Sequence, residues 1–129
     1  MTRKKHWSIM TDKNITVQVL RDRVKNFAKD RNFEQYHSLK NLAMALSCET
    51  AEFMDLLLWQ SDAEINVKLT ADRVFKQKLF DELGDVMHVV LAIANNIDGC
   101  DLSTVFFEKM KKTEERYTIA KSYGSNQKC

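Results

Sequence analysis

Residues 75–97 read FKQKLFDELGDVMHVVLAIANNI, a stretch long and periodic enough to form the central helix of the fold. At about 100° per residue, one side of such a helix carries an apolar stripe with a single acid in it. The stripe consists of Phe75, Leu79, Glu82, Val86, Val90, Ile93 and Ile97. Glu82 stands where a core hydrophobe is expected, and Asp85 borders it one turn later. This helix therefore presents a pair of carboxylates on the side that should face the protein interior.

The same arrangement occurs upstream, in residues 42–57, which read LAMALSCETAEFMDLL. Here Glu49 lies within an apolar stripe that includes Leu46 and Phe53, and Glu52 flanks it. An ionised carboxylate in an apolar setting costs several kcal/mol unless an opposite charge or a set of donors compensates it. If the two helices face each other, the repulsion between their acids is relieved by bound protons or by a divalent metal.

The chemistry of these side chains indicates which metal would suit them. Glu49, Glu52, Glu82 and Asp85 offer only oxygen atoms. Oxygen ligands favour Mg²⁺ or Mn²⁺, whereas zinc more often recruits His or Cys. We therefore predict a magnesium site, with manganese as a substitute, at these four residues.

The composition narrows the class of protein. A chain of 129 residues is one domain, and the absence of Pro with only three Gly favours an all-α fold. The net charge is only +2, from 20 basic and 18 acidic residues. Such a charge produces no strong electrostatic field that would attract a nucleic-acid polymer or a membrane surface. The three cysteines show neither disulfide nor zinc spacing, which fits a reducing cytoplasm. The longest apolar run is too short to cross a bilayer.

The periodicity and the capping residues predict the positions of the helices. The expected helices run from Thr16 to Arg31, from Leu39 to Trp59 after a Ser38 cap, from about Thr70 to Asn96, and from an Asp101 or Ser103 cap towards Tyr117. A polar connection is expected over Gln60–Leu69. The domain is expected to span residues 14–120, between a flexible basic arm at 1–13 and a polar tail at 121–129. Residues 86–97 are apolar on most faces of the helix, which predicts that this segment packs inside a bundle or an oligomer.

Several segments together resemble the MazG-like all-α nucleoside triphosphate pyrophosphatases. The ordered pair Glu49-x-x-Glu52 and Glu82-x-x-Asp85 is similar to the ExxE and ExxD signature of that group. Residues 31–42 resemble the RDWxQFHxPxNL segment of its dCTP pyrophosphatase branch, with Phe33 in place of the Trp. Trp59 matches the aromatic that closes the acid motif, and Lys109-Met with Arg116-Tyr resembles the KMxxNxxRYP segment.

The resemblance implies an activity, a fold and a set of contacts. It implies a four- to five-helix bundle that assembles into a dimer or tetramer. It further implies Mg²⁺-dependent hydrolysis of a nucleoside triphosphate between its α and β phosphates, on a dCTP-like or modified pyrimidine substrate, as nucleotide-pool house-cleaning. The four acids would be catalytic and hold the metal. The implied substrate contacts are Phe33, His37, Asn41, Trp59, Lys109 and Arg116.

Two other functions are compatible with the residues. A helical oligomerisation or regulatory module would keep this fold without turnover. A di-metal redox bundle is suggested by Asp85-x-x-His88, although such bundles need this element on two helices and it occurs once here. We interpret His88 as a packed or interface histidine that points away from the Glu82 stripe.

Overall fold

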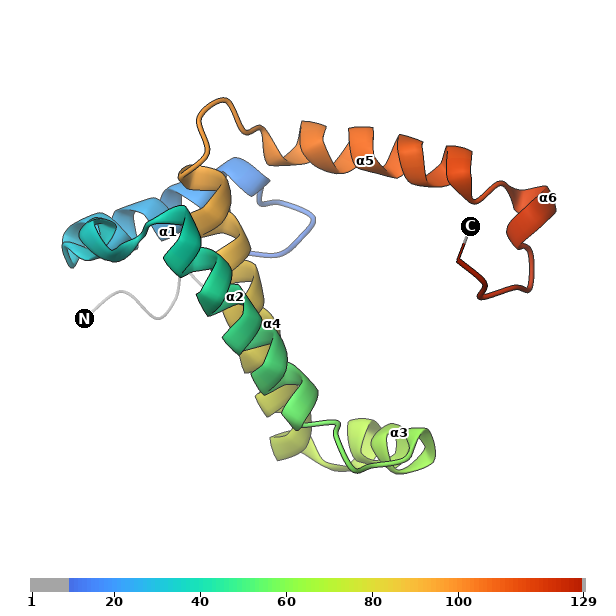
Figure 1. Ribbon diagram of the computed structural model, residues 1–129. Helices are drawn as coiled ribbons and strands as arrows, with labels where there is room; N and C mark the ends of the chain where they lie inside the picture. The colour runs from blue at the N-terminus through green and yellow to red at the C-terminus, as the bar shows by residue number, and fades with distance from the viewer. Residues whose placement is uncertain (1–9, 129) are drawn as a thin grey trace. The chain divides into compact units, whose positions relative to one another are not determined.

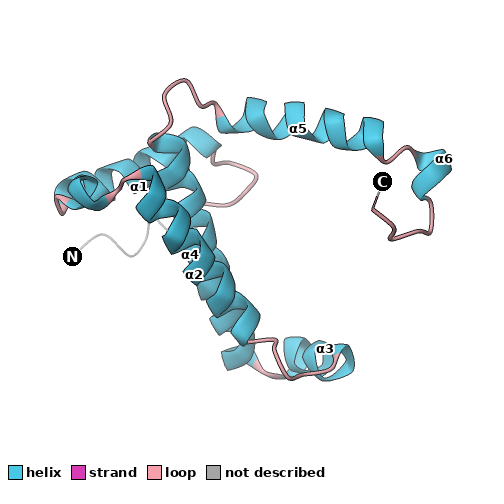
Figure 2. Cartoon of the chain, in the orientation of Figure 1, coloured by secondary structure: helices cyan, strands magenta, loops and turns pink. Residues whose placement is uncertain are grey.

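Helices and turns make up the described part of the chain, as the sequence predicted. The computed structural model describes residues 10–128, and no strand occurs within that range (Figures 1 and 2). The elements are α1 (Val17–Asp30), the 3-10 helix η2 (Phe33–Tyr36), α2 (Leu39–Asp55), α3 (Asp62–Ala71), α4 (Arg73–Asn95), α5 (Leu102–Arg116) and α6 (Ile119–Ser122). The chain divides into two compact units, with the boundary between Asp98 and Gly99. Most of the predicted N-terminal arm, residues 1–9, lies outside the described residues.

The first unit is built around the antiparallel pair of α2 and α4, which lie side by side (Figure 1). The pair packs through the two predicted stripes. Leu42 of α2 is 5% exposed, and Leu79 of α4 is 8% exposed. Removing this apolar surface from water holds the two helices together. As a result, the positions of Glu49 and Glu82 in their stripes place both acids at the seam between the helices.

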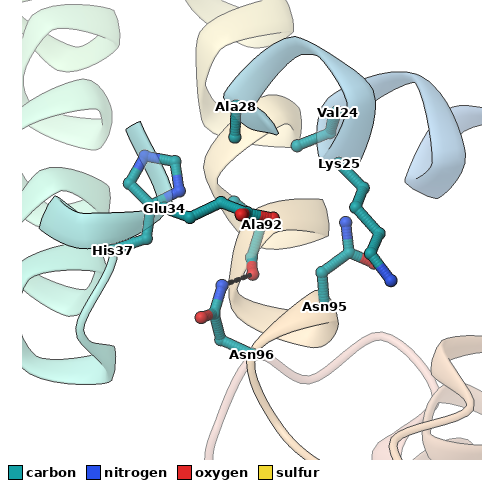
Figure 3. Close-up of a pocket in the computed structure, with 8 residues that line it drawn as sticks. All are labelled: Val24, Lys25, Ala28, Glu34, His37, Ala92, Asn95 and Asn96. Atoms are coloured by element: carbon teal, nitrogen blue, oxygen red, sulfur yellow. Dashed lines mark hydrogen bonds between the residues drawn. The ribbon is translucent and has the colours of Figure 1, made fainter. Parts of the chain in front are cut away.

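Helix α1 packs on the C-terminal half of α4 and is fastened there by polar contacts. Val24 and Ala28 of α1 are buried. The Arg21 guanidinium donates to the Asn95 side-chain oxygen and to the Ala94 carbonyl, each at 3.0 Å. Asn95 returns a hydrogen bond to the Arg21 carbonyl at 3.0 Å. Beside this junction, α1, η2 and α4 enclose a hollow of about 190 Å³ (Figure 3).

Most of the predicted helix starts agree with the structure. The Thr16 and Ser38 hydroxyls accept hydrogen bonds from Val19 and Asn41 at the starts of α1 and α2. Asp101 rather than Ser103 caps α5, because its carboxylate accepts from the Thr104 amide at 2.9 Å. Such caps satisfy amide groups that have no partner within the helix.

The region after the first acid pair differs from the prediction. Helix α2 ends at Asp55, and Trp59 lies in a turn with a left-handed φ of 68°, so the expected helix to Trp59 is too long. Residues 60–69 were expected to form a polar connection, but residues 62–69 are helical and make up most of α3. A capping box between Ser61 and Glu64 starts that helix. Its Val67 is 64% exposed, so capping marks α3 more clearly than an apolar stripe does.

The next helix also starts later than expected. Asp72, rather than Thr70, caps α4, and its carboxylate accepts from the Phe75 amide at 2.9 Å. The helix then continues to Asn95, close to the expected end, and Gly99 adopts a left-handed φ of 70° in the turn that follows.

In the second unit, α5 and α6 follow one another. Helix α5 exposes Phe106 and Phe107, and no described residue of this unit is classed as buried. The predicted polar tail from residue 121 begins inside α6. Among residues 10–128, none of the helices combines the length and the apolar character that a membrane span requires.

Candidate functional site

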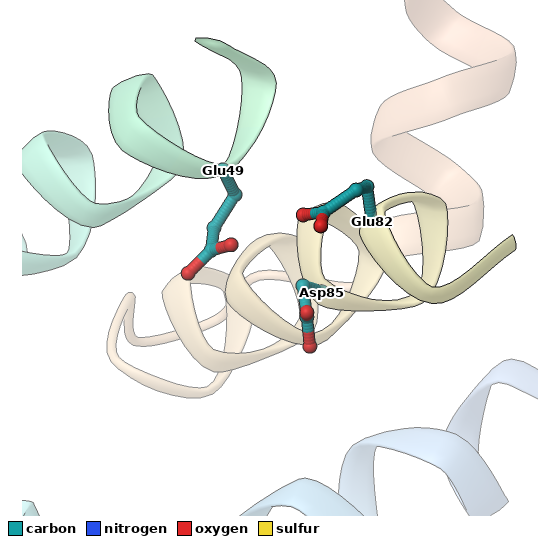
Figure 4. Close-up of side chains that lie close together, drawn as sticks. All are labelled: Glu49, Glu82 and Asp85. Atoms are coloured by element: carbon teal, nitrogen blue, oxygen red, sulfur yellow. The ribbon is translucent and has the colours of Figure 1, made fainter. Parts of the chain in front are cut away.

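Three of the predicted acids converge at the seam between α2 and α4. Oxygen atoms of Glu49, Glu82 and Asp85 all lie within 4.8 Å of one another (Figure 4). Glu82 and Asp85 come from successive turns of α4, and Glu49 reaches across from α2. Glu49 and Glu82 are half-buried, and Asp85 is exposed. The cluster is thus anchored at the seam and open to solvent on one side.

Mutual repulsion perturbs the protonation of this cluster. Partial removal from water raises the pKa of Glu82, and repulsion from Glu52, Asp85 and Glu49 raises it further. Partial burial likewise raises the pKa of Glu49, as do Glu52 and Asp85, while the nearby His88 lowers it. Glu52, the fourth predicted acid, is exposed and stands outside the trio, yet it is close enough to affect both groups.

The residues present fit a hard divalent cation. The trio offers carboxylate oxygens alone, which are the ligands of Mg²⁺ and Mn²⁺. One Glu82 oxygen, Oε2, is buried and has no hydrogen-bond partner among residues 10–128. A buried oxygen of this kind is costly unless a cation or a proton satisfies it. The trio is therefore a candidate site for a divalent cation.

An aromatic group lies beside the acids. The Phe27 ring meets His88 edge-on, with ring centroids 5.5 Å apart, and meets Phe33 at 6.1 Å. The Arg31 guanidinium lies 3.9 Å from the centre of the Phe27 ring. His88 packs against Phe27, and its charge lowers the pKa of Glu49.

Sequence reasoning missed the contacts that Phe27 makes with Arg31 and His88. Phe27 follows the helical spacing of the apolar residues of α1, yet its side chain is 38% exposed. The signal that could have found it is its position four residues before Arg31, a spacing that places a cation over a ring on one helix face.

Of the predicted contacts to base and sugar, His37 lines the hollow beside α1, whereas Asn41 does not. The Asn41 side chain donates to the Tyr36 carbonyl at 3.0 Å and so ties η2 to the start of α2. Phe33 is 40% exposed and belongs to the aromatic group.

The remaining predicted contacts belong to the turn after α2 and to α5. Trp59 is 93% exposed, so its indole has almost no packing within this chain. Lys109 and Arg116 belong to α5 in the second unit, where both are exposed.

Comparison with known proteins assigns the family. The model of the MazG nucleotide pyrophosphohydrolase domain matches residues 37–119, more than half of the chain. The chain belongs to this family. The match spans both acid pairs, and it confirms the resemblance found in the sequence.

Similar proteins are found among mammals and archaea. The chain is 33% identical over 110 residues to rat dCTP pyrophosphatase 1 and 30% identical over 113 residues to the human protein of that name. These alignments cover 85% and 88% of this chain but 64% and 65% of the relatives, so the chain spans slightly less than two thirds of their length. A crystal structure of a pyrophosphatase from Archaeoglobus fulgidus is 26% identical and superposes with a TM-score of 0.69, over 78% of this chain and 91% of that one.

Proposed function

We propose that the protein is a Mg²⁺-dependent nucleoside triphosphate pyrophosphohydrolase that releases a nucleoside monophosphate and pyrophosphate. The observation that carries this proposal is the convergence of Glu49, Glu82 and Asp85 at the seam of a MazG family fold. A polyphosphate cannot approach so many carboxylates without a cation, and a cation is what these oxygens require.

The acids have distinct tasks in this proposal. Glu49, Glu52, Glu82 and Asp85 would hold Mg²⁺, which when bound neutralises phosphate charge at the scissile anhydride. One of these carboxylates could also orient or deprotonate the attacking water. Asp55, one turn beyond Glu52, is a further candidate for that role.

Six further residues are proposed as substrate contacts. Phe33 and Trp59 offer aromatic faces for the base, and His37 and Asn41 offer polar groups for base or sugar. Lys109 and Arg116 lie two turns apart on one helix and carry the charges that phosphate oxygens bind. A dCTP-like or modified pyrimidine substrate, removed to clean or balance the nucleotide pool, is supported by the relatives named dCTP pyrophosphatase 1.

We further propose that the working form is a homo-oligomer, a dimer or a tetramer. Phe80, Leu83 and Met87 are 54%, 56% and 47% exposed and share one side of α4. A contiguous apolar stripe of this kind is unfavourable in water and is usually covered by another surface. Trp59, exposed at the end of α2, would reach a site on a second chain in such an assembly.

A nucleotide screen tests the activity. Canonical and modified triphosphates are incubated with and without Mg²⁺, and the products are separated as monophosphate, diphosphate, pyrophosphate and orthophosphate. We expect Mg²⁺-dependent formation of monophosphate and pyrophosphate in equal amounts. Formation of diphosphate and orthophosphate would contradict the cleavage position. Mg²⁺ binding without any turnover would favour the non-catalytic helical module instead.

A further inference from the structure

Trp59 combines an unfavourable backbone conformation with an exposed side chain. Among residues 10–128, two residues other than glycine have a positive φ, Asn32 at 55° and Trp59 at 68°. Asparagine tolerates the left-handed region, but a bulky aromatic residue does not favour it. The Trp59 side chain is also 93% exposed, whereas tryptophan is on average a well-buried residue. A strained conformation of this kind persists only where the surrounding structure holds it.

Gln60 closes the turn that contains Trp59. Its backbone amide donates to the Leu57 carbonyl at 3.3 Å, and its side-chain amide nitrogen donates to the Leu56 carbonyl at 2.6 Å. Carbonyl groups at the end of a helix receive no donor from a following turn, so they need partners from elsewhere. Gln60 supplies two such donors by folding back over the end of α2. This fold-back requires the chain to reverse at Trp59.

Lys68 of α3 holds the Gln60 side chain from the other side. Its ammonium group donates to the side-chain oxygen of Gln60, and both residues are half-buried. The same ammonium lies 5.4 Å from the centre of the Phe75 ring on α4, and Phe75 is 9% exposed. A charged donor makes a stronger hydrogen bond than a neutral one. The Gln60–Lys68 bridge, as we call these two residues, thus joins the turn after α2 to α3 and α4.

The bridge gives α3 a task that its packing does not explain. No residue of α3 is buried, yet the helix contacts α4 and places Lys68 in its last turn. The Lys68 carbonyl accepts from the Asp72 amide at 2.8 Å, which fixes this residue at the junction of α3 with α4. An aromatic side chain whose backbone is already held loses less conformational freedom on binding than one on a free loop.

We propose that Gln60 and Lys68 are positioning residues that hold Trp59 in its left-handed conformation, so that the indole is presented in advance to the base of the nucleotide. This inference rests on the proposed function, in which Trp59 offers its face to the base, and adds to it two residues that act through Trp59. Loss of the bridge should therefore weaken nucleotide binding and leave the chemical step nearly unchanged.

A double-mutant cycle tests whether Lys68 acts through Trp59. Values of KM and kcat for dCTP are measured by pyrophosphate release in the wild type, Lys68→Met, Trp59→Ala and the double variant. Lys68→Met alone should raise KM by about threefold or more and leave kcat within about twofold. In the Trp59→Ala background there is no indole to position, so the same change should alter KM by less than about 1.5-fold. An equal increase in KM in both backgrounds would overturn the inference.

Matched variants separate positioning from a general loss of folding. Lys68→Arg keeps a charged donor and should return KM to within about twofold of the wild type. Lys78→Met removes the same charge from an exposed position of α4 and should leave KM unchanged. Gln60→Leu removes both side-chain hydrogen bonds of Gln60 and should reproduce the KM increase of Lys68→Met. Melting temperatures are measured for every variant, and Gln60→Leu takes the place of Lys68→Met in the cycle if the latter does not fold.

The fluorescence of Trp59 separates this inference from the proposed function. The chain has two tryptophans, so a Trp7→Phe background leaves Trp59 as the sole indole. Titration with dCMP requires no turnover, and stacking of the base should quench the emission with a Kd that rises by about threefold or more in Lys68→Met.

The possible outcomes are distinct. Quenching that depends on Lys68, in a protein that releases no pyrophosphate, would overturn the activity and retain the inference. Turnover without quenching of Trp59, or with quenching that Lys68→Met and Gln60→Leu leave unchanged, would overturn the inference and retain the activity. Absence of both turnover and quenching would overturn both proposals.

Discussion

Replacing Glu82 by glutamine should abolish turnover while stabilising the metal-free protein. The substitution keeps the shape of the side chain and removes one negative charge from the cluster. The three carboxylates of the trio form three repelling pairs, and neutralising Glu82 leaves one of these, between Glu49 and Asp85, while Glu52 continues to repel Glu49. The amide nitrogen also offers a donor to the neighbouring carboxylates, which otherwise only repel. A metal ligand is lost at the same time, so we expect kcat to fall by about 100-fold or more.

The stabilisation should depend on pH in a defined direction. The folded-state pKa of Glu82 lies above its ordinary value of 4.5, so the folded protein binds this proton more tightly than the unfolded chain does. The resulting stability is fully present below that ordinary value and is lost as the pH rises through the folded-state pKa. Glutamine has no such titration. The melting temperature of Glu82→Gln should therefore exceed that of the wild type by roughly 2–4 °C at pH 8, and the difference should shrink towards pH 4.5.

The adjacent residue on α4 provides the control. Asp81 is exposed and accepts from the Gln77 side chain at 2.9 Å, so Asp81→Asn makes the same change of charge outside the cluster. Scanning calorimetry in EDTA and a Mg²⁺-dependent pyrophosphate assay measure both effects. Near-normal turnover in Glu82→Gln, or a lower melting temperature than wild type at pH 8, would refute the account of the cluster.

Two further predictions concern the helix seam and the exposed tryptophan. Leu79→Ala leaves a cavity at a buried position one turn before Glu82. It should therefore destabilise the fold by about 2–4 kcal/mol and lower the melting temperature by roughly 10 °C. A decrease of under about 3 °C would show that the seam is not packed at this position. Because the indole is 93% exposed, Trp59→Ala should change the free energy of unfolding of the monomer by no more than about 0.5 kcal/mol. If the ring stacks on the base, the same substitution should raise KM by roughly fivefold or more. Trp59→Phe should restore most of that loss, and an unchanged KM in Trp59→Ala would remove this residue from the site.

The acid cluster could be anticipated because helical geometry fixes direction. Once Glu49 and Glu82 lie in apolar stripes, packing of those stripes brings both acids to one seam, whatever the rest of the fold does. The ends of α2 and α3 could not be read in the same way. Ser61 and Glu64 form a local capping box in a polar stretch, and Trp59 adopts a left-handed backbone that its residue type does not favour.

The hollow was hidden from sequence reasoning for a different reason. Glu34 and Asn96 are separated by most of the first unit, and no periodic pattern relates them. They meet because Val24 and Ala28 bury α1 against α4, which brings η2 over the end of that helix. Proximity of this kind depends on tertiary packing, which a single sequence does not specify in advance.

Helix α4 is the common partner of α1, α2 and α3, whose main contacts are with it. Opening of α1 or α3 therefore need not disturb the α2 seam, whereas α4 cannot open without releasing all three. In native-state hydrogen exchange, the amides in the middle of α4 should be the slowest of the first unit, with α3 exchanging much earlier. During refolding, the acids acquire their spacing at the step in which α2 docks on α4.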